Sequence, residues 1–271
     1  MKNKIECPIC KKTNVKTFKD DSFECKTSYC KNKWKNDLYY KDEYDENKFI
    51  DARGDIIIAK GGDGTLLKAI NKFRYLNKPF FGKAAGTENF LMNSKTSDDI
   101  SENAKYKKFK LIKVEITYLR EVENSFHYEE PYEDKITFQA FNDVMIGSNM
   151  NAWIDFNVHD KDKIIGSFKG GGIIISTAQG STGINKNNNG VILPLGSHNW
   201  SITGDKVNRR INYVIKPHKT RIKFESRNYI SVWIDGQTHN ITDPVEVVLS
   251  KGDDVTVIFN DYDEFKRKRR I

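Results

Sequence analysis

One segment of the chain combines glycines with an acid in a pattern suited to phosphate chemistry. Gly61, Gly62, Asp63 and Gly64 follow an apolar run and precede a helical pattern that starts near Thr65. These residues predict a strand, a glycine turn and a helix whose first N–H groups would face a bound anion. A carboxylate beside phosphate is repulsive unless it accepts a proton from an attacking hydroxyl or helps to hold a metal. The alternative is a plain tight turn between strand and helix.

A second candidate segment, Asn142–Asp143, stands at the end of an alternating, strand-like run. An amide beside a carboxylate can bind a sugar diol, because the amide donates hydrogen bonds and the acid accepts them. An Asx turn is the alternative for this pair. Further along, Asp235–Gly236 lies between two strand-like runs and is predicted to be a hairpin turn.

A third segment begins as a β-branched run at 173–177 and continues into a loop of small and hydroxyl residues. This pattern is typical of a strand that delivers a loop to a site. We expect Ser181 and Thr182 to hydrogen-bond ribose or phosphate oxygens. In the alternative, their hydroxyls only satisfy backbone groups within a turn.

The cysteines of the chain all lie in its first 30 residues. A Cys-x2-Cys pair and a looser Cys-x4-Cys pair predict four thiolate ligands of a structural Zn²⁺, as in a zinc ribbon: Cys7, Cys10, Cys25 and Cys30. Metal binding would supply the folding energy of a module too small for its own core. The alternatives are a redox pair, which lacks a surrounding strand-helix unit, and disulfides, which lack a preceding signal-peptide pattern.

Taken together, these motifs resemble the NAD kinase family, within the superfamily that also contains diacylglycerol and sphingosine kinases. The glycine-aspartate loop matches that family residue for residue, and Asn142–Asp143 resembles its Asn-Glu element. Ser176–Thr182 is similar to its Ser-Thr-Pro-Thr-Gly-Ser-Thr run, and a late Asp-Gly-Gln at 235–237 is similar too. The resemblance covers about residues 55 to 260.

The resemblance implies a phosphotransferase that moves the γ-phosphate of ATP to the 2′-hydroxyl of the adenosine ribose of NAD, with Mg²⁺ as cofactor and NADP as product. It implies a homodimer or homotetramer, and it makes Asp63 the catalytic residue. The positions for which it implies contact with nucleotide are Gly61, Gly62, Gly64, Thr65, Asn89, Phe90, Asn142, Asp143, Thr177, Gly180, Ser181 and Thr182.

Three features depart from the family pattern. Gly171 replaces an acid, Ile184 replaces a tyrosine, and the Gly-Thr-x-Asn run at 86–89 is closer to the lipid-kinase branch. Phosphoryl transfer is therefore better supported than the identity of the acceptor. Two alternatives stay open, a kinase of the same superfamily with a nucleoside or lipid acceptor, and a non-catalytic sensor of a dinucleotide.

The remaining patterns predict an α/β plus β protein in which small motifs are carried by two larger lobes. The expected parts are a zinc-ribbon-like module at 1–36, an α/β nucleotide lobe at 37–110, an antiparallel, β-sandwich-like lobe at 111–260 and a charged tail at 261–271. We also predict a helix near 97–106, one strand over 135–147, and two separate strands at 245–249 and 254–259.

Composition narrows the class of partner. The formal net charge of +8 suits anionic ligands such as nucleotides. No apolar run approaches the roughly 20 residues that a membrane helix needs, so we expect a cytoplasmic protein without membrane contact. The basic cluster at 266–270 is predicted to be solvated and disordered, and we do not expect binding to nucleic acid.

Overall fold

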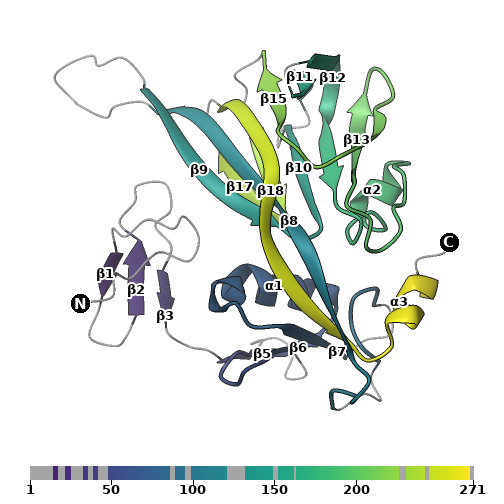
Figure 1. Cartoon of the computed structure of the whole chain (residues 1–271). Coiled ribbons are helices and arrows are strands. Elements are labelled where there is room, and N and C mark those ends of the chain that lie inside the picture. Colours follow the sequence, from purple (N-terminus) through teal and green to yellow (C-terminus); the bar gives the residue numbers. More distant parts are fainter. Residues whose placement is uncertain are drawn as a thin grey trace. The chain divides into compact units, whose positions relative to one another are not determined.

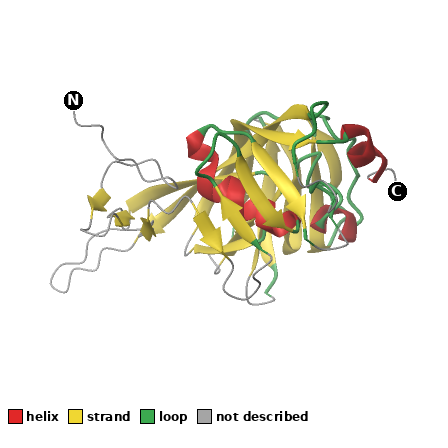
Figure 2. Cartoon of the chain, turned by 90° about the horizontal axis from the view of Figure 1, so that it is seen from below, coloured by secondary structure: helices red, strands yellow, loops and turns green. Residues whose placement is uncertain are grey.

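The computed structural model of the chain is dominated by β-strands, with a few short helices (Figures 1 and 2). It describes residues 15–17, 22–25, 33–35, 39–41, 48–85, 89–94, 99–120, 132–148, 152–161, 163–225, 230–241 and 244–268. The chain forms two compact units. Unit 1 comprises Met1–Phe109 and Asp254–Ile271, and unit 2 comprises Lys110–Asp253.

The first strands of unit 1 form a small antiparallel sheet in the order β1-β2-β3. The strands are β1 (Val15–Thr17), β2 (Ser22–Cys25) and β3 (Lys33–Lys35). Cys25 closes β2, where its backbone pairs with Val15. Cys7, Cys10 and Cys30, and the side chain of Cys25, lie outside the described residues.

The larger sheet of unit 1 carries the predicted strand-turn-helix. Its strands are β4 (Tyr39–Lys41), β5 (Phe49–Asp51), β6 (Ile57–Gly61), β7 (Phe80–Ala84) and the end of β18 (Pro244–Phe259). β6 and β7 are parallel, and the crossover between them contains α1 (Asp63–Phe73) and the short η1 (Arg74–Leu76). α1 contacts β5, β6 and β7 (Figure 1).

The apolar spacing of α1 explains why it packs on this sheet. Leu66, Ala69, Ile70 and Phe73 recur at helical period and are all buried. The following β-strand adds Phe80, which pairs with both Ile57 of β6 and Val257 of β18. The crossover therefore fixes where α1 begins.

One predicted element of unit 1 is wrong, and another differs from expectation. No helix forms among the described part of 97–106: residues 101–104 make a turn, and β8 (Lys105–Arg120) begins at Lys105. The final segment, expected to be disordered, contains α3 (Tyr262–Lys268). Its Phe265 is 1% exposed and packs edge-on against Phe259, with ring centroids 4.3 Å apart. This aromatic anchor folds the acidic-basic segment as a helix.

Unit 2 is an antiparallel sheet. Its main path runs β17-β16-β10-β12-β11-β15-β18, while β13 pairs with β12, β14 with β13, and β9 with β8. The bounds are β9 (Tyr132–Ala140), β10 (Asp143–Ser148), β11 (Ile154–Asp160), β12 (Lys163–Ser176), β13 (Trp200–Val207), β14 (Asn212–Ile215), β15 (Thr220–Phe224), β16 (Ile230–Ile234) and β17 (Gln237–Ile241). A short helix, α2 (Ile184–Asn187), contacts β12 and β13.

Two strand predictions in this part of the chain are corrected. The single strand expected at 135–147 is divided into β9 and β10, because the chain bends at Phe141 and Asn142. The strands expected at 245–249 and 254–259 are one continuous strand, β18. The Asp253 N–H donates to Gln139 Oε1 at 2.7 Å, and Gln139 Nε2 donates to Asp253 Oδ2 at 2.6 Å, so the polar middle of β18 is held in place.

The centre of unit 2 is apolar, and β12, which leads into the site loop, runs through it. Ile173, Ile174 and Ile175 of β12 are each 0% exposed, and the strand is paired on both edges, with β10 and β13. A continuous β-branched run of this kind is expected of a strand buried on both faces. Across the described residues, no helix has the length and apolarity that a membrane span requires.

Candidate functional site

Asp63 is the first residue of α1, and two main-chain groups hold its carboxylate. The N–H of Phe90 donates to Oδ2 and the N–H of Leu91 donates to Oδ1, each at 2.9 Å. These bonds join the start of the helix to the segment that follows β7. The orientation of the carboxylate is therefore fixed by backbone rather than by a flexible side chain.

The three glycines around Asp63 have different reasons to be glycine. A Cβ on Gly61 would lie 2.2 Å from Thr65 Oγ1, so the fold itself excludes a side chain there. A Cβ on Gly62 would meet Asn89 Oδ1 at 3.5 Å, an ordinary contact. A Cβ on Gly64 would meet no heavy atom within 4 Å. The fold does not need a glycine at 64, and this open backbone is what the approach of a ligand would require.

The N-terminus of α1 is available to an anion. Its N-cap residue, Gly62, has no side chain that could cap the helix, and the Thr65 N–H donates to the Gly62 carbonyl at 2.9 Å. The first N–H groups of a helix lack intrahelical partners and carry partial positive charge, which favours phosphate. Thr65 lies within this first turn. Phe90, in the segment that follows β7, is 38% exposed. Unit 1 thus presents a backbone phosphate site with one oriented carboxylate.

In unit 2, Asp235 organises the second predicted segment. Its carboxylate accepts hydrogen bonds from the N–H groups of Phe141, Asn142 and Asp143 at 2.8, 2.7 and 3.3 Å. Its own N–H donates to the Asp143 carbonyl at 3.1 Å. Asp235 has φ 50° and Gly236 has φ 78°, so the pair forms the predicted hairpin turn between β16 and β17. The turn therefore also fixes the bend before β10.

The polar groups of Asn142 and Asp143 are poised for a ligand. Burial, together with the nearby Asp235 carboxylate, raises the pKa of Asp143 to about 7. The Asn142 Oδ1 atom is buried and makes no hydrogen bond with a described residue. Such orphaned acceptors are rare in folded proteins, and a bound hydroxyl or N–H would satisfy this one. The pair can thus exchange hydrogen bonds with a sugar diol.

The loop after β12 is tied to the same bend. Thr177 Oγ1 is 2.9 Å from the carbonyls of both Phe141 and Asn142, and it accepts a hydrogen bond from the Gly180 N–H at 3.2 Å. Gln179 Nε2 donates to the Phe141 carbonyl at 2.7 Å. A Cβ on Gly180 would lie 2.2 Å from the Asn142 carbonyl oxygen. The structure therefore brings Asn142, Asp143, Thr177 and Gly180 together.

The two hydroxyls predicted to bind ligand differ in their surroundings. Ser181 is fully buried: its Oγ donates to the Ala178 carbonyl at 2.8 Å and accepts from the Leu193 N–H at 3.0 Å. Those contacts match the turn alternative for this residue. Thr182 is only half-buried, and its hydroxyl has no hydrogen bond with a described residue. Of the two, Thr182 is the one free to meet a ligand.

Asn185 holds the C-terminal part of the loop that follows β12. Its Nδ2 donates to the carbonyls of Ser181 and Val191 at 3.2 and 3.0 Å. Its Oδ1 accepts hydrogen bonds from the hydroxyls of Ser201 and Thr203 at 3.0 and 2.7 Å. The side chain is fully buried, so this network fixes α2 against β13.

Sequence reasoning missed Asp235, Gln179 and Asn185 as positioning residues. Asp235 stood out as a turn residue and as part of the Asp-Gly-Gln resemblance, but its carboxylate acts on residues some ninety positions earlier in the chain. Nothing in the local sequence announces a contact at that separation. The available signals were the Asp-Gly-Gln resemblance at Asp235 and the position of the polar residues Gln179 and Asn185 close to predicted site residues.

The side chains that the structure describes contain no group of three or more His, Cys, Asp or Glu that could hold a metal ion. The side chains of the four cysteines are not among those described, so the Zn²⁺ site remains a prediction. Mg²⁺ in phosphate sites is bound through one or two carboxylates together with substrate phosphates and water. Asp63 at the open helix start fits that donor set.

The chain is similar to known proteins over most of its length. The sequence model of the ATP-NAD kinase N-terminal domain matches residues 1–106. The NAD kinase of Xylella fastidiosa (strain 9a5c) is 30% identical over 216 residues, covering 76% of this chain and 78% of that protein. The NAD kinase of Finegoldia magna is 26% identical over 223 residues, covering 78% of this chain and 72% of its own.

Solved structures show the same fold. The yeast NADH kinase complexed with NADH has a TM-score of 0.66 at 18% identity, covering 80% of this chain and 65% of its own. The Archaeoglobus fulgidus NAD kinase in complex with ATP has a TM-score of 0.60 at 19% identity, covering 79% and 80%. The sequence identity to the Xylella protein over most of both chains shows that the chain belongs to the NAD kinase family.

Proposed function

We propose that this protein is an NAD kinase that transfers the γ-phosphate of ATP to the 2′-hydroxyl of the adenosine ribose of NAD, giving NADP and ADP. Family membership supports this assignment. The structural observation that carries it is the carboxylate of Asp63, held by the N–H groups of Phe90 and Leu91 at the open, glycine-lined start of α1.

The donor phosphates are assigned to the loop in unit 1. Gly61, Gly62, Gly64 and Thr65 are proposed to line the phosphates at the helix start, where the helix dipole favours negative charge. Mg²⁺, when bound with ATP, would offset the charge of the phosphates, with Asp63 as the residue of this loop able to hold it. Asn89 and Phe90 flank the loop and are proposed to line the nucleotide.

Asp63 is proposed to act on the attacking hydroxyl. The 2′-oxygen forms a bond to the γ-phosphorus while the bond from that phosphorus to the β,γ-bridging oxygen breaks, and ADP leaves with the bond electrons. The proton of the hydroxyl passes to the Asp63 carboxylate. Two backbone hydrogen bonds hold this carboxylate in one orientation, as a positioned base requires.

The acceptor nucleotide is assigned to the sites in unit 2. The orphaned Oδ1 of Asn142 accepts a hydrogen bond from a ribose hydroxyl, and Asp143 binds the neighbouring one. Thr182 adds a free hydroxyl. Thr177, Gly180 and Ser181 are proposed to shape the loop, since the hydroxyls of Thr177 and Ser181 already bond to the backbone.

A kinase of the same superfamily with another acceptor is the second candidate. It is favoured by Gly171, which has no acidic side chain and whose added Cβ would lie 3.1 Å from the Asp205 carbonyl oxygen. Ile184 is a second departure, at the start of α2. A non-catalytic dinucleotide sensor is the third, and lack of any phosphoryl transfer would identify it.

The deciding experiment is an acceptor screen. The purified chain is incubated with ATP, Mg²⁺ and, in separate reactions, NAD, NADH, a nucleoside or diacylglycerol vesicles, and products are separated by chromatography. NADP formed from NAD at a rate above the other acceptors is the expected result. ATP consumed only with a nucleoside or a lipid would overturn NAD as substrate and leave the kinase assignment standing.

Zinc, assembly and location complete the proposal. The four-cysteine spacing and the small antiparallel sheet β1-β2-β3 support a zinc ribbon that holds one Zn²⁺. Its sulfur ligands are proposed to be Cys7, Cys10, Cys25 and Cys30. We further propose a homodimer or homotetramer in the cytoplasm, which sedimentation and fractionation of the native protein would test.

A further inference from the structure

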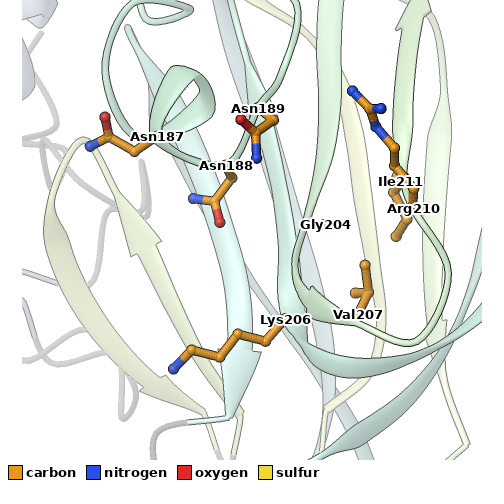
Figure 3. A pocket seen from close by; sticks show the side chains of 8 residues that line it. All are labelled: Asn187, Asn188, Asn189, Gly204, Lys206, Val207, Arg210 and Ile211. Atoms are coloured by element: carbon orange, nitrogen blue, oxygen red, sulfur yellow. The ribbon is translucent and has the colours of Figure 1, made fainter.

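A cationic pocket of unit 2 lies outside all of the residues assigned above. Its volume is about 510 Å³, within the usual range for small-molecule sites. The residues that line it are Asn187, Asn188, Asn189, Gly204, Lys206, Val207, Arg210 and Ile211. The asparagines come from the end of α2 and the turn after it, and the other residues come from β13 and the turn that leads to β14 (Figure 3).

The pocket carries positive charge that the described part of the protein does not neutralise. Neither Lys206 nor Arg210 has an ion pair or hydrogen bond from its side chain to a described residue. Asp205 stands between Gly204 and Lys206 in β13, but it does not line the pocket. Anionic ligands are therefore favoured here.

The two walls are fixed to one another before any ligand arrives. Asn212 Nδ2 donates to the Asn189 carbonyl at 3.1 Å, which joins β14 to the turn after α2. Asn185 bonds to the hydroxyls of Ser201 and Thr203 and so joins α2 to β13. A preformed pocket loses little entropy on binding.

The backbone at the pocket is also unusual. Lys206 has φ 47° and Asn189 has φ 59°. Asparagine tolerates this left-handed conformation, whereas a lysine there is uncommon and strained. Lys206 lies opposite Gly171, between the paired residues Gly172–Asp205 and Gly170–Val207, and the register of β13 with β12 is the same on both sides of it. The protein has a cationic side chain at a position where glycine would adopt the backbone conformation with less strain.

We propose that this pocket binds the phosphate groups of a nucleotide. Lys206 and Arg210 extend away from each other in Figure 3, so they would contact separate anionic groups of one ligand. Asn187, Asn188 and Asn189 offer amides that can both donate and accept hydrogen bonds, as a ribose or base requires. Val207 and Ile211 supply an apolar wall. NADP⁺, with a diphosphate and a separate 2′-phosphate, has this combination of groups.

The test is calorimetric titration of the full chain with NADP⁺, NAD⁺ and inorganic tripolyphosphate. Lys206→Gly and Arg210→Gln should each weaken NADP⁺ and tripolyphosphate binding about tenfold, because each removes a charge-assisted contact to phosphate. Lys206→Gly should also raise thermal stability, since it relieves the left-handed lysine. Asn187→Asp, which adds a negative charge at the pocket, should weaken binding as well. The matched controls Arg209→Gln and Lys216→Gln remove exposed charges of the same region that do not line the pocket, and should change affinity less than twofold.

Steady-state kinetics distinguish whether the phosphates bound in the pocket are those of the substrate NAD or those of a nucleotide at a separate site. A raised KM for NAD in Lys206→Gly and Arg210→Gln would place substrate phosphates in the pocket. An unchanged KM with weaker inhibition by NADP would make it a separate nucleotide site. Unchanged NADP⁺ affinity and kinetics in both variants would overturn the pocket while leaving the kinase untouched. Conversely, a chain that forms no NADP but loses NADP⁺ affinity in both variants would keep the pocket and overturn the kinase.

Discussion

Replacing Gly64 by alanine should move stability and activity in opposite directions. Gly64 is the second residue of α1, and an added Cβ meets no heavy atom within 4 Å. Alanine in place of glycine within a helix stabilises by about 0.5–1 kcal/mol, which corresponds to a rise in Tm of roughly 1–3 °C for a chain of this size. If ATP phosphates approach the backbone here, the new methyl group displaces them, and kcat/KM should fall by about 10²-fold or more.

Two further glycine variants calibrate this prediction. Gly54→Ala also adds a methyl group in open space, with its nearest heavy atom 4.0 Å away, and should leave activity unchanged. Gly61→Ala would place a Cβ 2.2 Å from Thr65 Oγ1, so it should lower both stability and activity. Thermal unfolding and NADP formation are measured on all three. A fully active Gly64→Ala variant would refute the phosphate role of the loop, and an unfolded one would show that glycine is needed there by the fold.

Three other predictions follow from unit 2 and the cysteine module. The pKa of Asp143 is raised to about 7, so the stability that its protonated form contributes is complete below about pH 4 and is lost as pH rises through 7. The free energy of unfolding of Asp143→Asn, relative to that of the wild type, should therefore rise between pH 4 and pH 8 by at most about 4 kcal/mol. The variant should also flatten the pH dependence of KM for NAD. If urea titrations gave the same difference in unfolding free energy between variant and wild type at pH 4 and at pH 8, this would be contradicted. Gly180→Ala should lower the free energy of unfolding by about 1–3 kcal/mol and weaken NAD binding, because its Cβ would lie 2.2 Å from the Asn142 carbonyl oxygen. A calorimetric Tm equal to that of the wild type would rule this clash out. Elemental analysis should find one zinc per chain, and none in a chain starting at Asp37; zinc retained by the shorter chain would place the metal elsewhere.

The strand-turn-helix at Gly61–Phe73 could be predicted because its signals are local. Glycines, an apolar strand and helical spacing all fall within a short window, and each supports the same arrangement. The hairpin at Asp235–Gly236 was predictable for the same reason. The division of 135–147 was not, because the bend at Asn142 depends on a carboxylate from another hairpin.

The roles of individual hydroxyls were equally beyond the sequence. Ser181 and Thr182 are adjacent and similar in type, yet one is enclosed by backbone partners and the other is free. That difference arises from the Leu193 N–H, which only the folded loop brings near Ser181. The α3 helix was missed because the charged residues around Tyr262 and Phe265 masked the two aromatic side chains that pack against Phe259.

The most direct test of the central claim is transfer of label from [γ-³²P]ATP to NAD by the purified chain. The wild type should form labelled NADP. Asp63→Asn should be slower by about 10²-fold or more, because the amide cannot accept the proton and turns an N–H toward the Phe90 or Leu91 N–H. Asp55→Asn, which alters an exposed carboxylate of the preceding loop, serves as the control and should match the wild type. Label that never reaches NAD, or an Asp63→Asn variant that transfers it at the wild-type rate, would contradict the account.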